Sequence, residues 1–333
     1  MPSRLKALVQ YIVILLVTVF LIWFSLRGIT PQEGENKWDY ILSAWQLADK
    51  RWLVVMAMFA ILSHIVRAMR WKMLIEQTGH PVKFSSSFLS LMVGYLVNLV
   101  IPRGGEVSRC YNLYKLDRAP VEVSFGTVVV ERVVDLLCLL LLIILAFVLE
   151  SGRLFSFVKT LPLDFSLASG KIWVMLLLAA ALLLVVVAGY WLVRRSPKLN
   201  AFFAKTWKGM KSGLLSVFRL RNKGLFIFQS TLIWVLYFFM SYAVLKAFQT
   251  TSHLGFSAVI SLFGIGSIAM AAPLPGGTGA YHVLVPQGLS FLYGLELKDA
   301  VALTFVFHGW QTFIMIVGGA LSLIITSIIS KKP

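Results

Sequence analysis

Long apolar runs separated by short polar connections dominate the pattern of the chain. Six of these runs reach the roughly 20 residues that an α-helix needs to cross the hydrocarbon core of a bilayer. They cover residues 8–26, 52–75, 126–149, 172–193, 225–248 and 301–325. The pattern therefore predicts an all-α, polytopic membrane helix bundle with about six full spans.

Two further apolar pieces, residues 84–101 and 254–274, run into breaks built from proline and paired glycines. The first break is residues 102–106 (PRGGE), and the second is residues 275–279 (PGGTG). Interrupted helices in corresponding positions of two halves are typical of transporters whose binding site lies near the bilayer midplane. We therefore predict two re-entrant or interrupted helical hairpins, related as an inverted repeat and entering from opposite sides of the membrane.

The composition indicates that lipid surrounds most of these helices. Apolar residues make up 59% of the 333 residues and charged residues 14%, and the mean hydropathy is +0.83. A soluble domain is only about 45 to 50% apolar and about a quarter charged. We therefore predict a single integral membrane domain over residues 1–333, with half-repeats at about 1–150 and 171–333.

The net charge of +17 does not indicate a nucleic-acid partner, because the basic residues flank the apolar runs. Residues 194–223 hold nine Lys or Arg and no acid, and both ends of the chain are basic. By the positive-inside rule, this loop and both termini are predicted to be cytoplasmic. The loop either forms amphipathic helices on an anionic leaflet or is an ordinary cytoplasmic loop.

Ionisable residues inside the apolar runs are the first candidates for function, because charge inside a membrane is costly. Glu131 and Asp135 lie four residues apart on one helical face, next to Arg132. Like charges at this spacing repel each other, so we expect cations or water to reach them. The alternative is a structural ion pair between Arg132 and Asp135 that holds the bundle together.

The run 52–75 carries His64, Arg67 and Arg70 near its end. His64 and Arg67 share a helical face, which favours a role for Arg67 in a polar interior. Arg70 follows one turn later. We expect its long side chain to snorkel to the headgroups, although it remains a candidate for the site.

The first break combines charge with backbone freedom. Arg103 and Arg109 lie on either side of Glu106, and Gly104 and Gly105 allow a close approach to a ligand. A helix that begins near Glu106 would offer free N–H groups to a phosphate. The alternative is an interfacial turn with surface salt bridges.

The second break has uncharged neighbours, and His282 and His308 are the nearest ionisable groups. We interpret it as a hinge or a close backbone approach, with His282 as a packing residue. The candidate set for substrate binding, with no catalytic and no metal-ligating residue, is Arg67, Arg70, Arg103, Gly104, Gly105, Glu106, Arg109, Glu131, Arg132, Asp135, Pro275, Gly276, Gly277 and His308.

The charges of this set indicate the kind of ligand. Five arginines against three acids leave a net charge of +2, and arginine binds phosphate bidentately. A phosphate-bearing lipid is therefore favoured over a metal cation. We expect no cofactor. The sequence has no Walker-type phosphate loop, so we expect no ATPase activity of its own, and its two cysteines imply no disulfide framework. The sequence leaves open whether the protein forms a homo-oligomer.

Several segments together resemble the transmembrane domain of lysylphosphatidylglycerol synthases, a flippase-like membrane family. They are residues 79–84 (GHPVKF), 93–98 (VGYLVN), 102–106 (PRGGE) with Arg109, 131–135 (ERVVD) and 273–279 (PLPGGTG). The resemblance implies a lipid flippase domain of the bacterial inner membrane. The family's two-domain members also synthesise an aminoacylated phospholipid. Because the sequence ends at Pro333 without a soluble aminoacyl-transferase domain, we expect no such activity here.

Three functions are compatible with these features. The first is a lipid translocator, not an enzyme, that moves an anionic or aminoacylated phospholipid or a polyprenyl-phosphate-type lipid. The second is an intramembrane lipid-modifying enzyme that uses Glu131, Asp135 and either His64 or His308 as acid–base groups. The third is a non-transporting membrane subunit that docks through loop 194–223.

Overall fold

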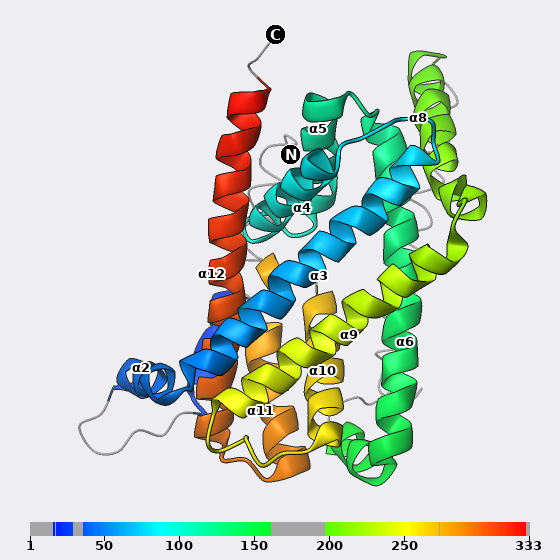
Figure 1. Ribbon diagram of the computed structural model, residues 1–333. Helices are drawn as coiled ribbons and strands as arrows, with labels where there is room; N and C mark the ends of the chain where they lie inside the picture. Colours follow the sequence, from blue (N-terminus) through cyan, green and yellow to red (C-terminus); the bar gives the residue numbers. More distant parts are fainter. Residues whose placement is uncertain (1–15, 17, 29–35, 161–196, 273, 331–333) are drawn as a thin grey trace.

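The computed structural model describes residues 16, 18–28, 36–160, 197–272 and 274–330, and the regular secondary structure in these ranges is helical (Figure 1). Short 3-10 helices η2 (Ser216–Arg219) and η3 (Pro275–Gly277) supplement the α-helices. The α-helices with both ends in the described ranges are α2 (Lys37–Leu47), α3 (Lys50–Glu76), α4 (Phe84–Asn98), α5 (Gly104–Asp117), α6 (Val121–Thr160), α8 (Pro197–Leu215), α9 (Lys223–Ala247), α10 (Phe256–Ala271), α11 (Ala280–Tyr293) and α12 (Leu297–Ile329).

Within the described ranges, three helices are long and apolar enough to cross a membrane: α3, α9 and α12. They contain the predicted runs 52–75, 225–248 and 301–325, apart from Phe248, which caps α9. The run 126–149 lies within the 40-residue helix α6. The run 172–193 lies outside the described residues, as do residues 8–15 and 17 of the run 8–26, and the rest of that run is helical. The all-helical class is confirmed, whereas the number of spans and the inverted repeat stay predictions.

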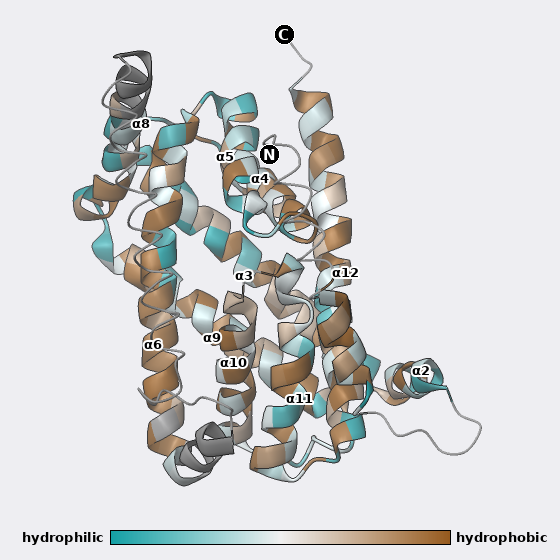
Figure 2. Ribbon diagram, turned by 180° about the vertical axis from the view of Figure 1, so that it is seen from behind, coloured by the Kyte–Doolittle hydropathy of each residue, from teal (hydrophilic) through white to brown (hydrophobic). Residues whose placement is uncertain are grey.

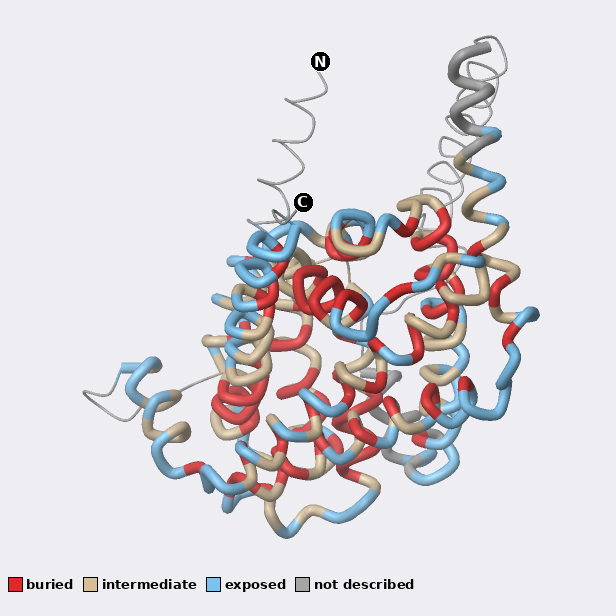
Figure 3. Tube along the Cα trace, turned by 45° about the horizontal axis from the view of Figure 1, so that its top comes forward, coloured by how far each residue is buried: buried red, intermediate tan, exposed pale blue. Residues whose placement is uncertain are grey.

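The outer surface of the bundle is apolar along much of its height. Leu141 and Val148 on α6 are 66% and 72% exposed, and Leu321 and Ile324 on α12 are 55% and 56% exposed. Figure 2 shows these two helices largely in the hydrophobic colour, while Figure 3 shows buried positions gathered inside the bundle. A water-soluble protein rarely exposes such continuous apolar surface, so this exterior is suited to lipid.

Helices α3 and α9 run side by side in opposite directions and form the diagonal centre of the bundle (Figure 1). The Asp49 carboxylate caps α3 by accepting a hydrogen bond from the Arg51 N–H at 2.9 Å. Small and medium side chains of α3, including Met56 and Ala60, belong to the main apolar core with Val244 of α9. This pairing fixes how the polar positions of α3 are oriented.

The first predicted hairpin is formed by α4 and α5. The two helices approach so closely at Gly94 and Gly105 that a Cβ on Gly105 would lie 2.1 Å from the Gly94 carbonyl oxygen. Asn98 accepts a hydrogen bond from the Gly105 N–H at 2.7 Å and so satisfies one free donor at the start of α5. Arg103 makes the turn with φ of 60°, an uncommon backbone conformation for a residue other than glycine.

The second predicted hairpin is formed by α10 and α11, with η3 at its tip. Gly276 and Gly277 adopt φ of 56° and 72°. Residues that carry a Cβ atom rarely adopt such positive φ values. Farther from the tip, Gly266 of α10 makes room for the ring of Tyr281, since a Cβ there would lie 2.9 Å from that ring. Glycines therefore both turn this hairpin and close it.

The tips of the two hairpins meet inside the bundle. A Cβ on Gly276 would lie 2.9 Å from the Leu99 Cδ2 atom, and the Arg103 Nη2 donates to the Ala271 carbonyl oxygen at 3.2 Å. In Figures 1 and 2, α4 and α5 occupy one end of the bundle and α10 and α11 the other. The chain thus brings two distant breaks, near residues 102 and 276, into contact.

The basic segment 194–223 contains α8, which runs alongside α6 in Figures 1 and 2. The two helices are in backbone contact, because a Cβ on Gly126 would lie 2.3 Å from the Met210 carbonyl oxygen and one on Gly213 2.3 Å from the Val123 carbonyl oxygen. Part of this segment is therefore packed against the bundle. Its contact with an anionic leaflet and its cytoplasmic location stay predictions.

Candidate functional site

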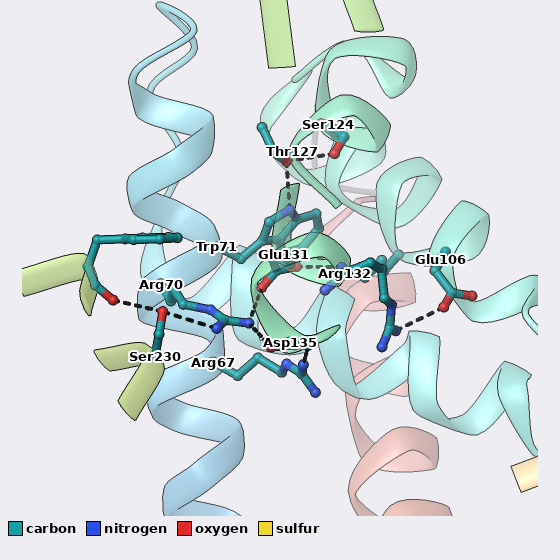
Figure 4. A network of polar contacts seen from close by, with 12 residues as sticks. Arg67, Arg70, Trp71, Glu106, Ser124, Thr127, Glu131, Arg132, Asp135 and Ser230 are labelled. Atoms are coloured by element: carbon teal, nitrogen blue, oxygen red, sulfur yellow. Dashed lines mark hydrogen bonds and ion pairs between the residues drawn. The ribbon is translucent and has the colours of Figure 1, made fainter. Parts of the chain in front are cut away.

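A network of ion pairs links α3, α5 and α6 inside the bundle (Figure 4). Arg70 of α3 donates to Asp135 of α6 at 2.9 Å, lies 3.5 Å from Glu131, and donates to the Ser230 hydroxyl of α9 at 3.2 Å. Its side chain is 0% exposed. The expectation that Arg70 snorkels to the headgroups is therefore wrong, because two carboxylates of α6 hold its guanidinium in the interior.

Glu131 is the centre of the most deeply buried part of the network. Its second carboxylate oxygen accepts a hydrogen bond from Arg109 of α5 at 2.5 Å, and the side chain is 1% exposed. The Arg109 guanidinium also lies 4.6 Å above the ring of Trp71, whose indole N–H donates to Thr127 at 3.0 Å. Because these charges are paired and shielded, their geometry is that of a structural clamp between three helices.

Arg67 lies at the edge of the clamp, where the interior opens. It forms an ion pair with Asp135 and donates to the Tyr237 hydroxyl at 3.1 Å. Arg67 and Asp135 are 12% and 14% exposed, in contrast to the sealed Arg70. This pair can therefore meet a ligand while still linked to the buried network.

Arg132 forms an ion pair with Glu106 of α5 at 2.8 Å, and Figure 4 shows it directed away from Arg70 and Asp135. The alternative left open by the sequence, an ion pair between Arg132 and Asp135, is therefore wrong. Asp135 instead holds two arginines of α3, because α3 packs against the face of α6 that carries Asp135. At 49% exposure, Arg132 is the most accessible member of these ion pairs.

A cavity of about 580 Å³ lies between the two hairpins, α3, α6, α9 and α12. It is large enough for the headgroup of a lipid, since small-molecule sites are typically about 300 to 1,000 Å³. Seven members of the predicted set line it: Arg67, Arg103, Glu106, Arg132, Asp135, Gly276 and Gly277. The structure thus brings together residues from both breaks and from two charged helices.

The other seven members of the predicted set support this cavity from outside its lining. Arg70, Arg109 and Glu131 form the buried clamp, and Gly104 and Gly105 close the first hairpin. Pro275 begins η3, and a ring nitrogen of His308 lies 3.0 Å from the Gly276 carbonyl oxygen, which ties α12 to the second tip. These seven residues therefore hold in place the helices and turns that line the cavity.

Sequence reasoning left several lining residues out of the set: His64, Tyr95, Asn98, Trp234, Tyr237, Ser241 and Gln311. A usable signal was present in α9, where Trp234, Tyr237 and Ser241 follow a helical spacing of three and four residues within an otherwise apolar span. In α4, Tyr95 and Asn98 lie three residues apart just before the break. Such polar stripes mark the helix face that lines a cavity.

The lining is amphipathic. Its charged groups come from α3, α6 and the start of α5, and further hydrogen-bonding groups come from α4, α9 and α12. Apolar surface is supplied by Leu139, Leu262, Met270, Ile314 and Met315. Among the residues that the structure describes, no group of three or more His, Cys, Asp or Glu is placed to hold a metal ion. The arrangement is suited to a ligand with a polar head and an apolar body.

Comparison with known proteins agrees with the sequence resemblance. The chain is 33% identical over 100 residues to the UPF0104 membrane protein of Methanocaldococcus jannaschii, a match that covers 29% of this chain and 30% of that protein. No solved structure matches the chain. The family model described as the lysylphosphatidylglycerol synthase TM region matches residues 10–319. This chain therefore belongs to the lysylphosphatidylglycerol synthase transmembrane-region family.

Proposed function

We propose that this membrane protein is a lipid translocator, in which a charged headgroup passes through the cavity between the two hairpins while the hydrocarbon tails stay in the bilayer. The observation that carries the proposal is the contact of the two broken tips beside an ionic cavity. Arg103 reaches Ala271 across this contact, and both lie on the cavity wall. Transporters with interrupted helices place their substrate sites at such a meeting point.

The barrier to lipid exchange is the removal of the headgroup from water. An isolated charge at the bilayer centre costs about 2.5 kcal/mol or more. Arg67, Arg103 and Arg132 replace part of the lost hydration of an anionic group, and the neighbouring carboxylates keep the empty cavity close to neutral. The apolar lining next to them is suited to the first carbons of the tails.

The proposal includes the location and orientation expected from the sequence. We place the chain in the bacterial inner membrane as a multi-pass protein, with both termini and segment 194–223 in the cytoplasm. The basic flanks support this orientation. In the same scheme the two hairpins enter from opposite leaflets and belong to two inverted half-repeats.

An acid–base enzyme is less well supported. Glu131 is held by Arg70 and Arg109, and Asp135 by Arg67 and Arg70. Among the described residues, His308 is linked to a backbone carbonyl at Gly276 and makes no hydrogen bond to either acid. General acid–base catalysis needs such groups within hydrogen-bond reach of one another and of a substrate.

Lipid exchange in reconstituted vesicles tests the proposal. A fluorescent anionic phospholipid is quenched from outside by dithionite, and the protected fraction reports how fast the inner leaflet becomes accessible. We expect Arg103→Gln to slow exchange at least tenfold, because it removes a cavity cation that is paired only with a backbone carbonyl among the described residues. Arg51→Gln, at an exposed position of α3, is the matched control and should exchange at the wild-type rate.

The outcome against the proposal is equally direct. If the wild-type protein exchanges no lipid faster than empty vesicles do, or if Arg103→Gln and Arg51→Gln exchange at the same rate, translocation through this cavity is rejected.

A further inference from the structure

A basic and aromatic surface runs from α8 across η2 to the first residue of α9. It lies at the end of the bundle that also holds α5 (Figures 1 and 2). All of its residues are exposed, and none of them lines the cavity between the hairpins. We call it the α8–η2 surface, and its members are Trp207, Lys208, Lys211, Phe218, Arg219, Arg221 and Lys223.

Glycine contacts determine which face of α8 is free. A Cβ on Gly209 would lie 2.5 Å from the Glu122 side chain, and one on Gly213 would lie 2.3 Å from a backbone oxygen of α6. This glycine face is therefore pressed against α6. The exposed positions 204, 207, 208 and 211 are spaced by three and four residues and so share the opposite face. Packing against α6 thus turns one tryptophan and two lysines of α8 outward.

The charge of the α8–η2 surface is uncompensated. It holds five basic side chains, and segment 194–223 contains no Asp or Glu. None of the five forms an ion pair with another described residue. Glu122 lies on the glycine face of α8, on the other side of the helix. A partner that brings negative charge to this surface is therefore favoured.

The position of the surface identifies that partner as a membrane. Lys223 begins α9, which is long and apolar enough to cross a bilayer. Ile227 and Phe228, one turn farther along, are 63% and 61% exposed. Exposed apolar side chains thus follow directly after the basic ones, as they do where a helix passes from the headgroups into hydrocarbon. Trp207 and Phe218, which are 57% and 74% exposed, fit the same boundary, because aromatic side chains collect there.

We infer that the α8–η2 surface binds the headgroups of an anionic leaflet and concentrates anionic phospholipid along the outside of α6 and α9. A basic residue near such a leaflet contributes about 1 kcal/mol, or about a fivefold preference for the anionic lipid. These lipids lie on the exterior of the bundle and are distinct from a headgroup in the cavity. The inference goes beyond the proposed function and does not depend on it.

Photo-crosslinking from position 218 tests the inference. Phe218→Cys is made in a chain whose native Cys110 and Cys138 are replaced by alanine, and a benzophenone maleimide is attached to the new thiol. The protein is irradiated in vesicles that contain equal amounts of phosphatidylglycerol and phosphatidylcholine, and the adducts are identified by mass. We expect phosphatidylglycerol adducts to exceed phosphatidylcholine adducts about fivefold in 0.1 M salt. The preference should fall to about twofold or less in 1 M salt, because the screening length drops from about 10 Å to about 3 Å.

The matched control places the same label at Phe313→Cys on α12. Phe313 is an aromatic residue that is 53% exposed on the apolar exterior. Helix α12 carries no Lys or Arg after Lys298. A label at this position should capture both lipids with less than a twofold preference.

Charge removal identifies the groups responsible. Arg219→Gln combined with Arg221→Gln removes the two basic side chains nearest position 218 in the chain and should reduce the preference to about twofold or less. Arg51→Gln combined with Lys298→Gln removes two charges at the other end of the bundle and should keep the full preference (Figure 1). In both variants a label at position 313 should still capture lipid, which shows that the protein is inserted.

Equal capture of the two lipids from position 218 would overturn the inference, as would a preference that survives 1 M salt or the loss of both arginines. The same label is also irradiated in native membranes. Lipid adducts there support the inference, whereas adducts to a second copy of the chain or to another protein in place of lipid reject it in favour of protein docking. Arg103→Gln in the cavity should leave the preference unchanged, so loss of lipid exchange and loss of this surface are separate results.

Discussion

At the scale of single residues, three neighbouring arginines of the network have different environments. Arg70 is sealed in the clamp, Arg67 lies at its edge, and Arg132 is half exposed at the cavity wall. Their sequence context is similar, since each lies in or near an apolar run beside another charge. Their environments differ because each arginine faces a different direction around its helix. That direction depends on how α3 and α6 pack against the other helices of the folded bundle.

The clamp predicts a large stability effect at Glu131. Glu131→Gln removes the charge between Arg70 and Arg109 and leaves two buried guanidinium groups with less compensation. We expect a loss of about 3 to 5 kcal/mol in unfolding free energy, measured as the shift of unfolding in a denaturant titration in detergent. Glu76→Gln is the matched control, because Glu76 forms a half-exposed pair with Lys72 at 2.6 Å and should cost about 1 kcal/mol or less.

Equal losses for these two variants would mean that Glu131 is not a structural anchor. In that case the Glu131 carboxylate would be better assigned to ligand binding than to the clamp.

At the scale of elements, the hairpins depend on backbone contacts that only glycine permits. Gly105→Ala places a Cβ 2.1 Å from the Gly94 carbonyl oxygen, so α4 and α5 must separate. Alanine favours a helix by up to about 1 kcal/mol over glycine, but the clash is with backbone that cannot rotate away. We expect a net loss of about 1 to 3 kcal/mol, read as a lower unfolding temperature in detergent.

Gly264→Ala is the control for this prediction, since no atom lies within 4 Å of the added Cβ in α10. It should match or slightly exceed the wild-type unfolding temperature. A Gly105→Ala protein as stable as Gly264→Ala would contradict the close packing of the first hairpin.

The hairpins also show what sequence alone could and could not predict. The breaks at 102–106 and 275–279 were identifiable because proline and paired glycine are local signals, and the structure has a turn at each. The role of Gly94 was not visible, because its partner Gly105 lies eleven residues away across a turn. The same limit applies to the site. Charged residues were recognisable by type, but Tyr95 and Trp234 become part of the cavity wall only once α4 and α9 pack with the other helices.

At the scale of the whole molecule, the two hairpin tips are in contact with each other at the wall of the cavity. Leu99 packs against Gly276, and Arg103 reaches Ala271. If a headgroup passes between the tips, they must separate during each cycle. A covalent link between them should then leave the fold intact and stop exchange.

This can be tested with Leu99→Cys and Gly276→Cys in a chain whose native Cys110 and Cys138 are replaced by alanine. The cysteine at 276 adopts positive φ at a cost of about 1 to 2 kcal/mol, which a folded bundle can tolerate. A short bis-thiol reagent that reduction cleaves should link the pair, detected as an intramolecular mass increase, and leave the Leu99→Cys variant alone unlinked. Lipid exchange in vesicles should fall at least tenfold on linking and return on reduction. No linking would contradict the tip contact itself, whereas linking with unchanged exchange would show that the tips are fixed and that the headgroup takes another route around them.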